Sequence, residues 1–319
     1  MAYSSVKKFS RSLRGLRWAI EKSSLDLRIG ELFEFKWRKA IDKIMKCERT
    51  FDAVVIFNIP IRPMMKVFDY VKRNYGLDLF YYDGDIPEVL PEFGTFGYNY
   101  YNDVDLSTFS GFISNSEGVN ARLSEMGAKH ITTIHYGIDP EIYHPYPVDK
   151  KFDIMFSGSG TRGREEWIRK MVIEPAELSL FHYAVSGRLP LFSGKITNLG
   201  FLHYSEWLRR VSSSHINLNI SRYAHSSVSG TSTYRIFELC GTASAVITNP
   251  HKGIEKWYTP GKEIYVLSDD ENPTDVYKAM LSDKDSLLIM GSLARKKTLE
   301  KHTCENRAQS MLDYVSSII

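Results

Sequence analysis

Short apolar runs alternate with helix-patterned stretches along most of this 319-residue sequence, and this alternation constrains the fold more than any other feature. In the first half the runs are DAVVIFN (52–58), LDLFYYD (77–83), GFISN (111–115) and HITTIHYG (130–137). Runs of this length, rich in β-branched and aromatic residues, are typical of buried strands. Repetition of strand, helix and strand predicts a parallel sheet with helices on both faces.

The same rhythm restarts after a proline-rich, aromatic connection at 139–149. A chain of this length exceeds one usual hydrophobic core, so we predict two α/β domains. The first covers residues 1–144 and the second residues 145–300, with a last helix over 301–319. The strands expected in the second domain are KFDIMFSGSG, LSLFHYAVSG, KITNLGF, HINLNIS, SAVIT and EIYVLS.

The composition is that of a folded soluble protein, with 43% apolar and 25% charged residues. Cys47, Cys240 and Cys304 are odd in number and form no CxxC pair, which favours free thiols in a reducing compartment over a disulfide framework or a zinc site. Because we find neither a run long enough to span a membrane nor a signal-peptide pattern, we expect a cytoplasmic protein.

Positive charge is concentrated in residues 1–50, which hold 13 Lys and Arg against 6 Asp and Glu, although the whole chain carries only +3. Amphipathic helices are predicted there at 11–22 and 34–47. Such asymmetry can mark a patch for anionic lipid, nucleic acid or a polyanionic acceptor, and with anionic lipid the protein would lie peripherally at a membrane. A solvated helix face is the alternative, since acids are interleaved with the bases.

Two turns in the second half have the form of phosphate sites, because ligands of open parallel sheets bind beyond the strands' carboxyl ends, at helix N-termini. In FSGSGTRGREEW (156–167), Gly158 and Ser159 allow a close backbone approach, and Arg162 or Arg164 could neutralise a diphosphate. The segment is neither a P-loop nor a GxGxxG motif, and an ordinary glycine-rich turn is the alternative.

The second turn opens SGTSTYRIFELCG (229–241), where Ser229, Gly230, Thr231 and Ser232 precede a predicted helix. Arg235 and Glu238 are three apart and hence neighbours on that helix. Since an apolar strand follows at once, Glu238 should be partly buried, and ribose hydroxyls would be suitable partners for it. A capped helix with a surface ion pair is the alternative.

Four segments in unbroken order, over about half the chain, resemble GT-B glycosyltransferases of the group 1 type, and most closely the branch related to the spore-maturation protein CgeB. They are ISNSEGVNARLSEMGAKHITTIHYGIDPEIYHP, FDIMFSGSGTRGREEWI, NLGFLHYSEWLRRVSSSHINLNIS and YRIFELCGTASAVITNPHKGIEKWYTPGKEIYVLSDDEN. The resemblance implies two Rossmann-like domains facing a cleft, with a UDP- or GDP-sugar bound mainly by the second. It also implies that the C-terminal helices cross back onto the first domain.

The same resemblance implies roles for individual residues. Glu238 would bind the ribose, while Ser229–Ser232 and Arg235 would lie along the diphosphate and sugar. Arg162 or Arg164 would add a phosphate cation, and the turn at Gly200–Leu202 would touch the base. Many group 1 enzymes carry a further glutamate, which would contact the donor sugar, where this chain has Gly230. The chain departs from the family pattern at this position and lacks the side chain for that contact.

Three further residues are candidate catalytic groups in such a cleft. Asp83 and Asp85 end the LDLFYYD strand and could accept the acceptor's proton, with a solvated Asp-Gly turn as the alternative. His225, beside Arg222, is the third, with a surface histidine as the alternative. In a retaining enzyme, which the resemblance suggests, a donor phosphate oxygen could take the proton instead. No DxD stands near the phosphates, so we expect no metal and no tightly bound cofactor.

The sequence thus predicts transfer of a sugar to a hydroxyl acceptor, either a glycan, a lipid-linked sugar or, less in keeping with the sequence, a hydroxylated DNA base. Two other functions stay open. One is a nucleotide-sugar epimerase or phosphorylase on the same fold. The other is a non-catalytic binding or scaffold protein, for which Gly230 and the short first domain argue.

Overall fold

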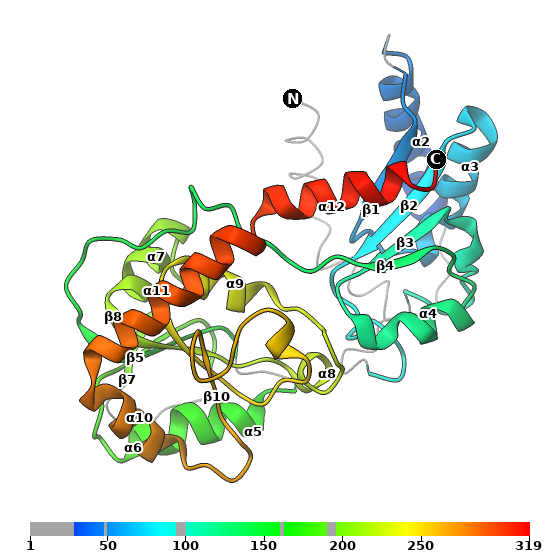
Figure 1. Cartoon of the computed structure of the whole chain (residues 1–319). Helices are drawn as coiled ribbons and strands as arrows, with labels where there is room; N and C mark the ends of the chain where they lie inside the picture. The colour runs from blue at the N-terminus through cyan, green and yellow to red at the C-terminus, as the bar shows by residue number, and fades with distance from the viewer. Residues whose placement is uncertain (1–28, 48–49, 94–99, 160–162, 190–195) are drawn as a thin grey trace.

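The computed structural model describes residues 29–47, 50–93, 100–159, 163–189 and 196–319. The helix expected at 11–22 and the side chain of Arg162 lie outside these ranges. Within them, the chain forms two lobes, each built on one parallel β-sheet (Figure 1). The predicted α/β class with two Rossmann-like domains is confirmed.

The first sheet contains four parallel strands in the order β1-β2-β3-β4. They are β1 (Ala53–Phe57), β2 (Asp78–Asp83), β3 (Gly111–Ser114) and β4 (Ile131–Thr133). The last strand is shorter than expected because the chain turns toward the other lobe after Ile134, where the N–H of Tyr136 donates to Ser232 Oγ at 3.2 Å.

Helices cover one face of this sheet, and the chain's last helix covers the other (Figure 1). On the second face, α12 (Cys304–Ser316) sets the ring of Tyr314 edge-on against Phe80, with centroids 5.8 Å apart. The first face is covered by α2 (Ile29–Met45), α3 (Met65–Tyr75) and α4 (Asn120–Glu125), together with the 3₁₀ turns η1 (Arg62–Met64), η2 (Leu106–Thr108) and η3 (Glu117–Val119).

The second sheet has six parallel strands in the order β10-β9-β8-β5-β6-β7. If the strands of this sheet are numbered from β5 as 1 to β10 as 6, their order from the β7 edge is 3-2-1-4-5-6, which is the Rossmann order. The direction of strand order reverses between β5 and β8. The strands are β5 (Phe152–Ser157), β6 (Tyr183–Ser186), β7 (Ile196–Gly200), β8 (Ser214–Asn219), β9 (Ala245–Thr248) and β10 (Tyr265–Val266).

Two hydrophobic layers enclose the second sheet. One layer packs α7 (Tyr204–Ser212) and α9 (Tyr234–Gly241) against it, and the other packs the helical segment from Glu165 to Glu177 and α10 (Pro273–Ser282). The remaining helices are α5 (Glu165–Ile168), η4 (Arg169–Ile173), α6 (Glu174–Glu177), α8 (Tyr223–Ser226), η5 (Ile254–Lys256) and α11 (Lys284–Lys301).

Two segments cross between the lobes side by side. The outward one runs from Ile134 to Lys151, and the return is the junction of α11 and α12. They are joined by backbone hydrogen bonds from Ile138 to His302 (3.0 Å) and from Cys304 to Ile138 (2.8 Å). The domain bounds at 144 and 300 stay predictions, and both fall within or beside these crossings.

Candidate active site

The reversal of strand order in the second sheet locates the candidate site. Ligands of doubly wound sheets bind at such a switch point, beyond the carboxyl ends of the two strands that flank it. The loop after β5 carries Arg164 and the loop after β8 carries Arg222. The N–H of Tyr223 donates to the carbonyl of Gly163 at 2.8 Å, which joins the two loops.

Three arginines share this place. The pKa of Arg164 is lowered to about 10 by burial first and then by the positive charges of Arg222 and Arg235, with Glu88 opposing them. Arg164 donates to the carbonyl of Ser159 at 3.3 Å, but its Nε is buried and finds no hydrogen-bond partner among the described residues. Gathered guanidinium groups repel one another, and an anion between them would remove that repulsion.

Helix α9 begins beside this arginine cluster. Its N-cap residue, Thr233, makes no side-chain cap, and in the described part of the chain its buried hydroxyl has no hydrogen-bond partner. The first N–H groups of a helix lack partners within the helix, so this uncapped end can donate to an anion. The sequence interpretation missed Thr233, although it directly follows the predicted loop.

Glu238 lies one turn into α9, and only 8% of the residue is exposed. Arg235 pairs with its Oε2 at 2.9 Å, as the spacing predicts, and the Arg235 guanidinium also lies 4.7 Å from the ring centroid of Trp207. Its other oxygen, Oε1, accepts from the hydroxyl of Tyr143 at 2.6 Å. Tyr143 was not predicted, since it lies in the connection, 95 positions away.

The loop Ser229–Ser232 makes contacts that differ from the expected ones. Its backbone and hydroxyl groups bind the first domain: Ser232 N–H donates to the carbonyl of Asn115 at 2.9 Å, and Thr231 Oγ1 lies 2.6 Å from Ser116 Oγ. Gly230 has a φ of +62° and both its backbone groups are bonded, to Lys252 and Glu117. In this conformation the loop is an interdomain contact.

Asp83 and Asp85 differ sharply in environment. Asp83 is 4% exposed, accepts from the Tyr101 hydroxyl and from the N–H of Asp85 (2.8 Å), and burial raises its pKa to about 6. Asp85 is exposed, yet partial desolvation raises its pKa, while the positive charge of Arg222 in the other domain lowers it. Asp85 is therefore an exposed carboxylate that lies within electrostatic reach of a cation of the other domain.

The turn between these two aspartates is held from three sides. Asn58 Oδ1 accepts from the N–H of Gly84 at 2.6 Å, and the Gly84 carbonyl accepts from Tyr136 and Asn115, both at 2.7 Å. A Cβ at position 84 would collide with the Tyr136 hydroxyl. Asn58, at the carboxyl end of β1, could have been found by its place after a buried strand, but the sequence interpretation passed over it.

His225 lies on α8, close to the arginines. Burial first, and then the charges of Arg222, His251 and Arg164, lower its pKa to about 3, so the imidazole is neutral near pH 7. Its Nδ1 is buried without a hydrogen-bond partner in the described ranges. A group with so low a pKa is a weak general base.

The turn after β7 places Leu202 half-buried against the core of the second domain. Gly200 adopts a φ of +62°, and Phe201 beside it is 79% exposed. The guanidinium of Arg188, after β6, lies 5.8 Å from the Phe201 ring centroid. The contact of this turn with a base stays a prediction.

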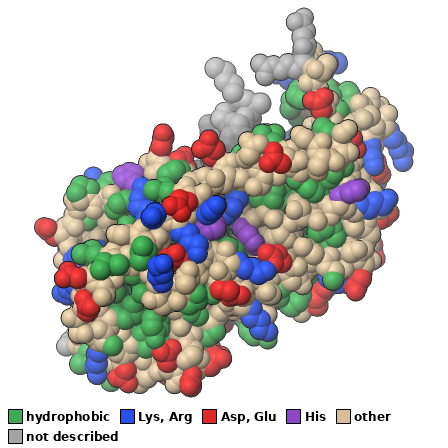
Figure 2. All heavy atoms as spheres, viewed as in Figure 1, with side chains coloured by type: hydrophobic (Ala, Val, Ile, Leu, Met, Phe, Trp, Pro, Cys, Tyr) green, Lys and Arg blue, Asp and Glu red, His purple; other side chains and the backbone are tan. Residues whose placement is uncertain are grey.

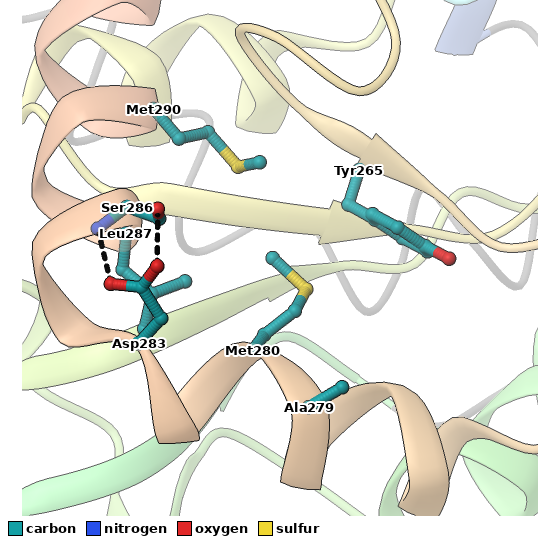
Figure 3. A pocket seen from close by; sticks show the side chains of 7 residues that line it. All are labelled: Tyr265, Ala279, Met280, Asp283, Ser286, Leu287 and Met290. Carbon is teal, nitrogen blue, oxygen red and sulfur yellow. Dashed lines mark hydrogen bonds between the residues drawn. The ribbon is translucent and has the colours of Figure 1, made fainter.

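A cavity of about 300 Å³ lies elsewhere in the second domain, between β10, α10 and α11 (Figure 3). Its lining is mostly apolar and includes Met280, Leu287 and Met290, and Asp283 bonds only within its own turn to Ser286. None of its lining residues belongs to the switch-point loops, so it is a separate feature.

In the described ranges no three His, Cys, Asp or Glu side chains are grouped so that they could hold a metal ion. Among the same residues, every helix is too short or too polar to cross a membrane.

Known proteins resemble this chain in part of its sequence and in its fold. Residues 164–313, just under half of the chain, match the family model described as glycosyl transferase-like. HepE from Anabaena, solved with UDP-glucose, is similar with a TM-score of 0.68 at 14% identity over 92% of this chain and 84% of that one. No curated protein matches the sequence.

Two more solved structures are similar. Sucrose-phosphate synthase from Thermosynechococcus elongatus gives a TM-score of 0.67 at 12% identity, covering 88% of this chain and 77% of that one. A glycosyltransferase from Rickettsia africae gives 0.64 at 13% identity, covering 93% and 83%. At such identities the likeness shows the fold, which is the GT-B fold. The family match marks residues 164–313 as glycosyl transferase-like. The CgeB-like branch stays a prediction.

Proposed function

We propose that this protein transfers a sugar from a nucleoside-diphosphate sugar to a hydroxyl acceptor in the space between its two domains. The observation that carries the proposal is the cluster of Arg164, Arg222 and Arg235 at the switch point, with the buried carboxylate of Glu238 beside it. Guanidinium groups suit the two phosphates of the donor, and the carboxylate suits its ribose.

UDP is the nucleotide we propose first, because HepE is described with UDP and with UDP-glucose. GDP remains the alternative. The uncapped start of α9 and the hydroxyl of Thr233 would add donors to the diphosphate. Positive charge placed where the leaving diphosphate develops its own charge would favour departure without a metal ion.

Two routes exist for the acceptor proton. In a retaining reaction a donor phosphate oxygen takes it, and we propose this route by analogy with group 1 enzymes. Asp85 is the protein group best placed to orient the acceptor hydroxyl, because it is exposed between the domains and faces Arg222. Asp83 is buried and fully engaged, so its contribution would be to hold the Asp85 turn.

Calorimetry with UDP, GDP and their sugar conjugates tests the donor site. Arg164→Ala should weaken UDP binding about tenfold or more, since a charge-assisted bond is lost from a desolvated site. Arg169→Ala is the matched control, because Arg169 is exposed and paired with Glu174 on the surface. Equal affinity of both variants for UDP would refute the site. Isomerisation of the donor without an acceptor would indicate an epimerase, and binding without turnover a scaffold.

We further propose that α2 makes the peripheral contact expected from the charge of residues 1–50. Two acids of this helix are engaged by other side chains: Glu34 pairs with Arg38, and Asp42 accepts from Tyr70 and Tyr75 at 2.7 and 2.6 Å. The helix exposes basic and apolar side chains, among them Phe35, Lys39, Lys43 and Ile44, and the exposed Lys46 directly follows it. Such a face suits an anionic lipid surface, and through it a lipid-linked acceptor.

A further inference from the structure

We propose that Tyr143 is a positioning residue of the donor site, whose hydroxyl holds the Glu238 carboxylate in the orientation that a ribose diol requires. This inference rests on the proposed function and adds to it a residue of the connection between the domains. The sequence patterns above give Tyr143 no role.

Tyr143 is fixed in place by its surroundings. It is 6% exposed, and its ring packs against Tyr204, Trp207 and Tyr234 with centroids 5.3, 6.4 and 5.8 Å away. Arg295 donates both to the Tyr143 carbonyl, at 2.9 Å, and to the carbonyl of Gly241 at the end of α9. The tyrosine and the helix that carries Glu238 are therefore held as one unit.

The hydrogen bonds of Glu238 leave room for one particular kind of ligand. An ionised carboxylate has about four acceptor positions, two on each oxygen. Tyr143 uses one on Oε1 and Arg235 one on Oε2. One position on each oxygen remains, and two such positions match the two neighbouring hydroxyls of a ribose.

Tyr143 is suited to be a permanent donor. Burial and the negative charge of Glu238 both raise the pKa of its phenol far above the usual range, so it keeps its proton at any working pH. Without this hydroxyl, Oε1 of a nearly buried carboxylate would lack its partner, and the side chain would gain freedom to turn about its last bond.

The test compares two ligands that differ only in the ribose hydroxyls, UDP and 2′,3′-dideoxy-UDP. Wild-type protein should bind UDP more tightly. Tyr143→Phe keeps the packed ring and removes only the hydroxyl, so it should weaken UDP binding about tenfold and leave dideoxy-UDP binding nearly unchanged. Donor KM should rise with little change in kcat.

Tyr277→Phe is the matched control, since Tyr277 is fully buried in the same domain and its hydroxyl donates to the Met171 carbonyl at 2.9 Å. It should lower thermal stability without changing the preference for UDP over dideoxy-UDP. Equal preference in wild type and Tyr143→Phe, with UDP binding retained, would overturn this inference alone. Failure of the wild-type protein to bind any nucleoside diphosphate would remove the proposed function and this inference with it.

Discussion

The hydroxyl oxygens of Ser116 and Thr231 lie 2.6 Å apart, although the residues are 115 positions apart and belong to different domains. Around them, Asn115 binds both backbone groups of Ser232, and Glu117 and Gly118 donate to Gly230 and Ser229. Charged and histidine side chains also gather where the domains meet (Figure 2), where Glu117 pairs with Lys256 and faces His135. The two domains are thus joined by a polar contact as well as by the crossings.

Removing one hydroxyl from this contact should destabilise the protein. Thr231→Val leaves Ser116 Oγ without its closest partner in a fully buried place, so we expect a loss of about 1–3 kcal/mol in the free energy of unfolding. Denaturant unfolding measures it. Thr197→Val, on an exposed position of β7, is the control and should change stability by less than about 0.5 kcal/mol. Equal losses would contradict the role of the contact.

Nucleotide affinity should depend on the Arg235–Glu238 pair. Arg235→Ala and Glu238→Ala are each expected to weaken UDP binding by about 1–3 kcal/mol. Because the side chains bond one another, the double variant should lose less than the sum of the two. Calorimetry checks this, with Asp275→Ala and Lys278→Ala, an exposed pair at the same spacing on α10, as controls. Unchanged affinity in both single variants would disprove the assignment of this helix.

Stability should fall as the pH rises from about 4 to about 6 because of Asp83. Its pKa in the folded protein, about 6, lies above the ordinary 3.8, so the folded state holds the proton over a range in which the unfolded chain has released it. The contribution of Asp83 to the free energy of unfolding is therefore complete below pH 3.8 and is lost as the pH rises above about 6. Asp83→Asn should remove this component from a pH series of unfolding midpoints. An unaltered slope in the variant would show that other groups cause it.

Binding to lipid vesicles should require the outward lysines of α2. Lys39→Glu with Lys43→Glu should abolish sedimentation with vesicles containing phosphatidylserine, and added salt should weaken the wild-type interaction. Lys278→Glu with Lys284→Glu reverses the same charge on the second domain and should leave binding intact. Equal binding of the wild type to neutral phosphatidylcholine vesicles would count against an electrostatic contact.

The strands could be predicted well because buried strands form continuous apolar runs in the sequence. Strands β2, β3 and β9 each lie inside an expected run, and β8 begins one residue before its run. Helix α9 begins and ends within one turn of the expected helix. The Arg235–Glu238 pair followed from local spacing alone. Local sequence patterns were therefore enough to predict strands, helices and contacts between residues that are close in the sequence.

Contacts between distant segments could not be derived in this way. The polar loop at 229–232 suggested an open phosphate site, but hydroxyl and backbone groups serve an interdomain contact equally well, and only the fold brings Asn115 to them. Likewise, no spacing links Tyr143 to Glu238, or Arg164 to Arg222. The switch point that gathers these arginines depends on strand order, which periodicity does not reveal.

The position of α12 has a consequence for how the protein is made. The first domain's sheet is finished on one face only when Tyr314 and Met311 reach Tyr82, Ile113 and Ile134. During synthesis those strands emerge some two hundred residues before the helix that covers them. While the second domain is translated, one apolar face of the N-terminal domain therefore stays uncovered. The N-terminal domain can complete its folding only after the second domain and α12 have been synthesised.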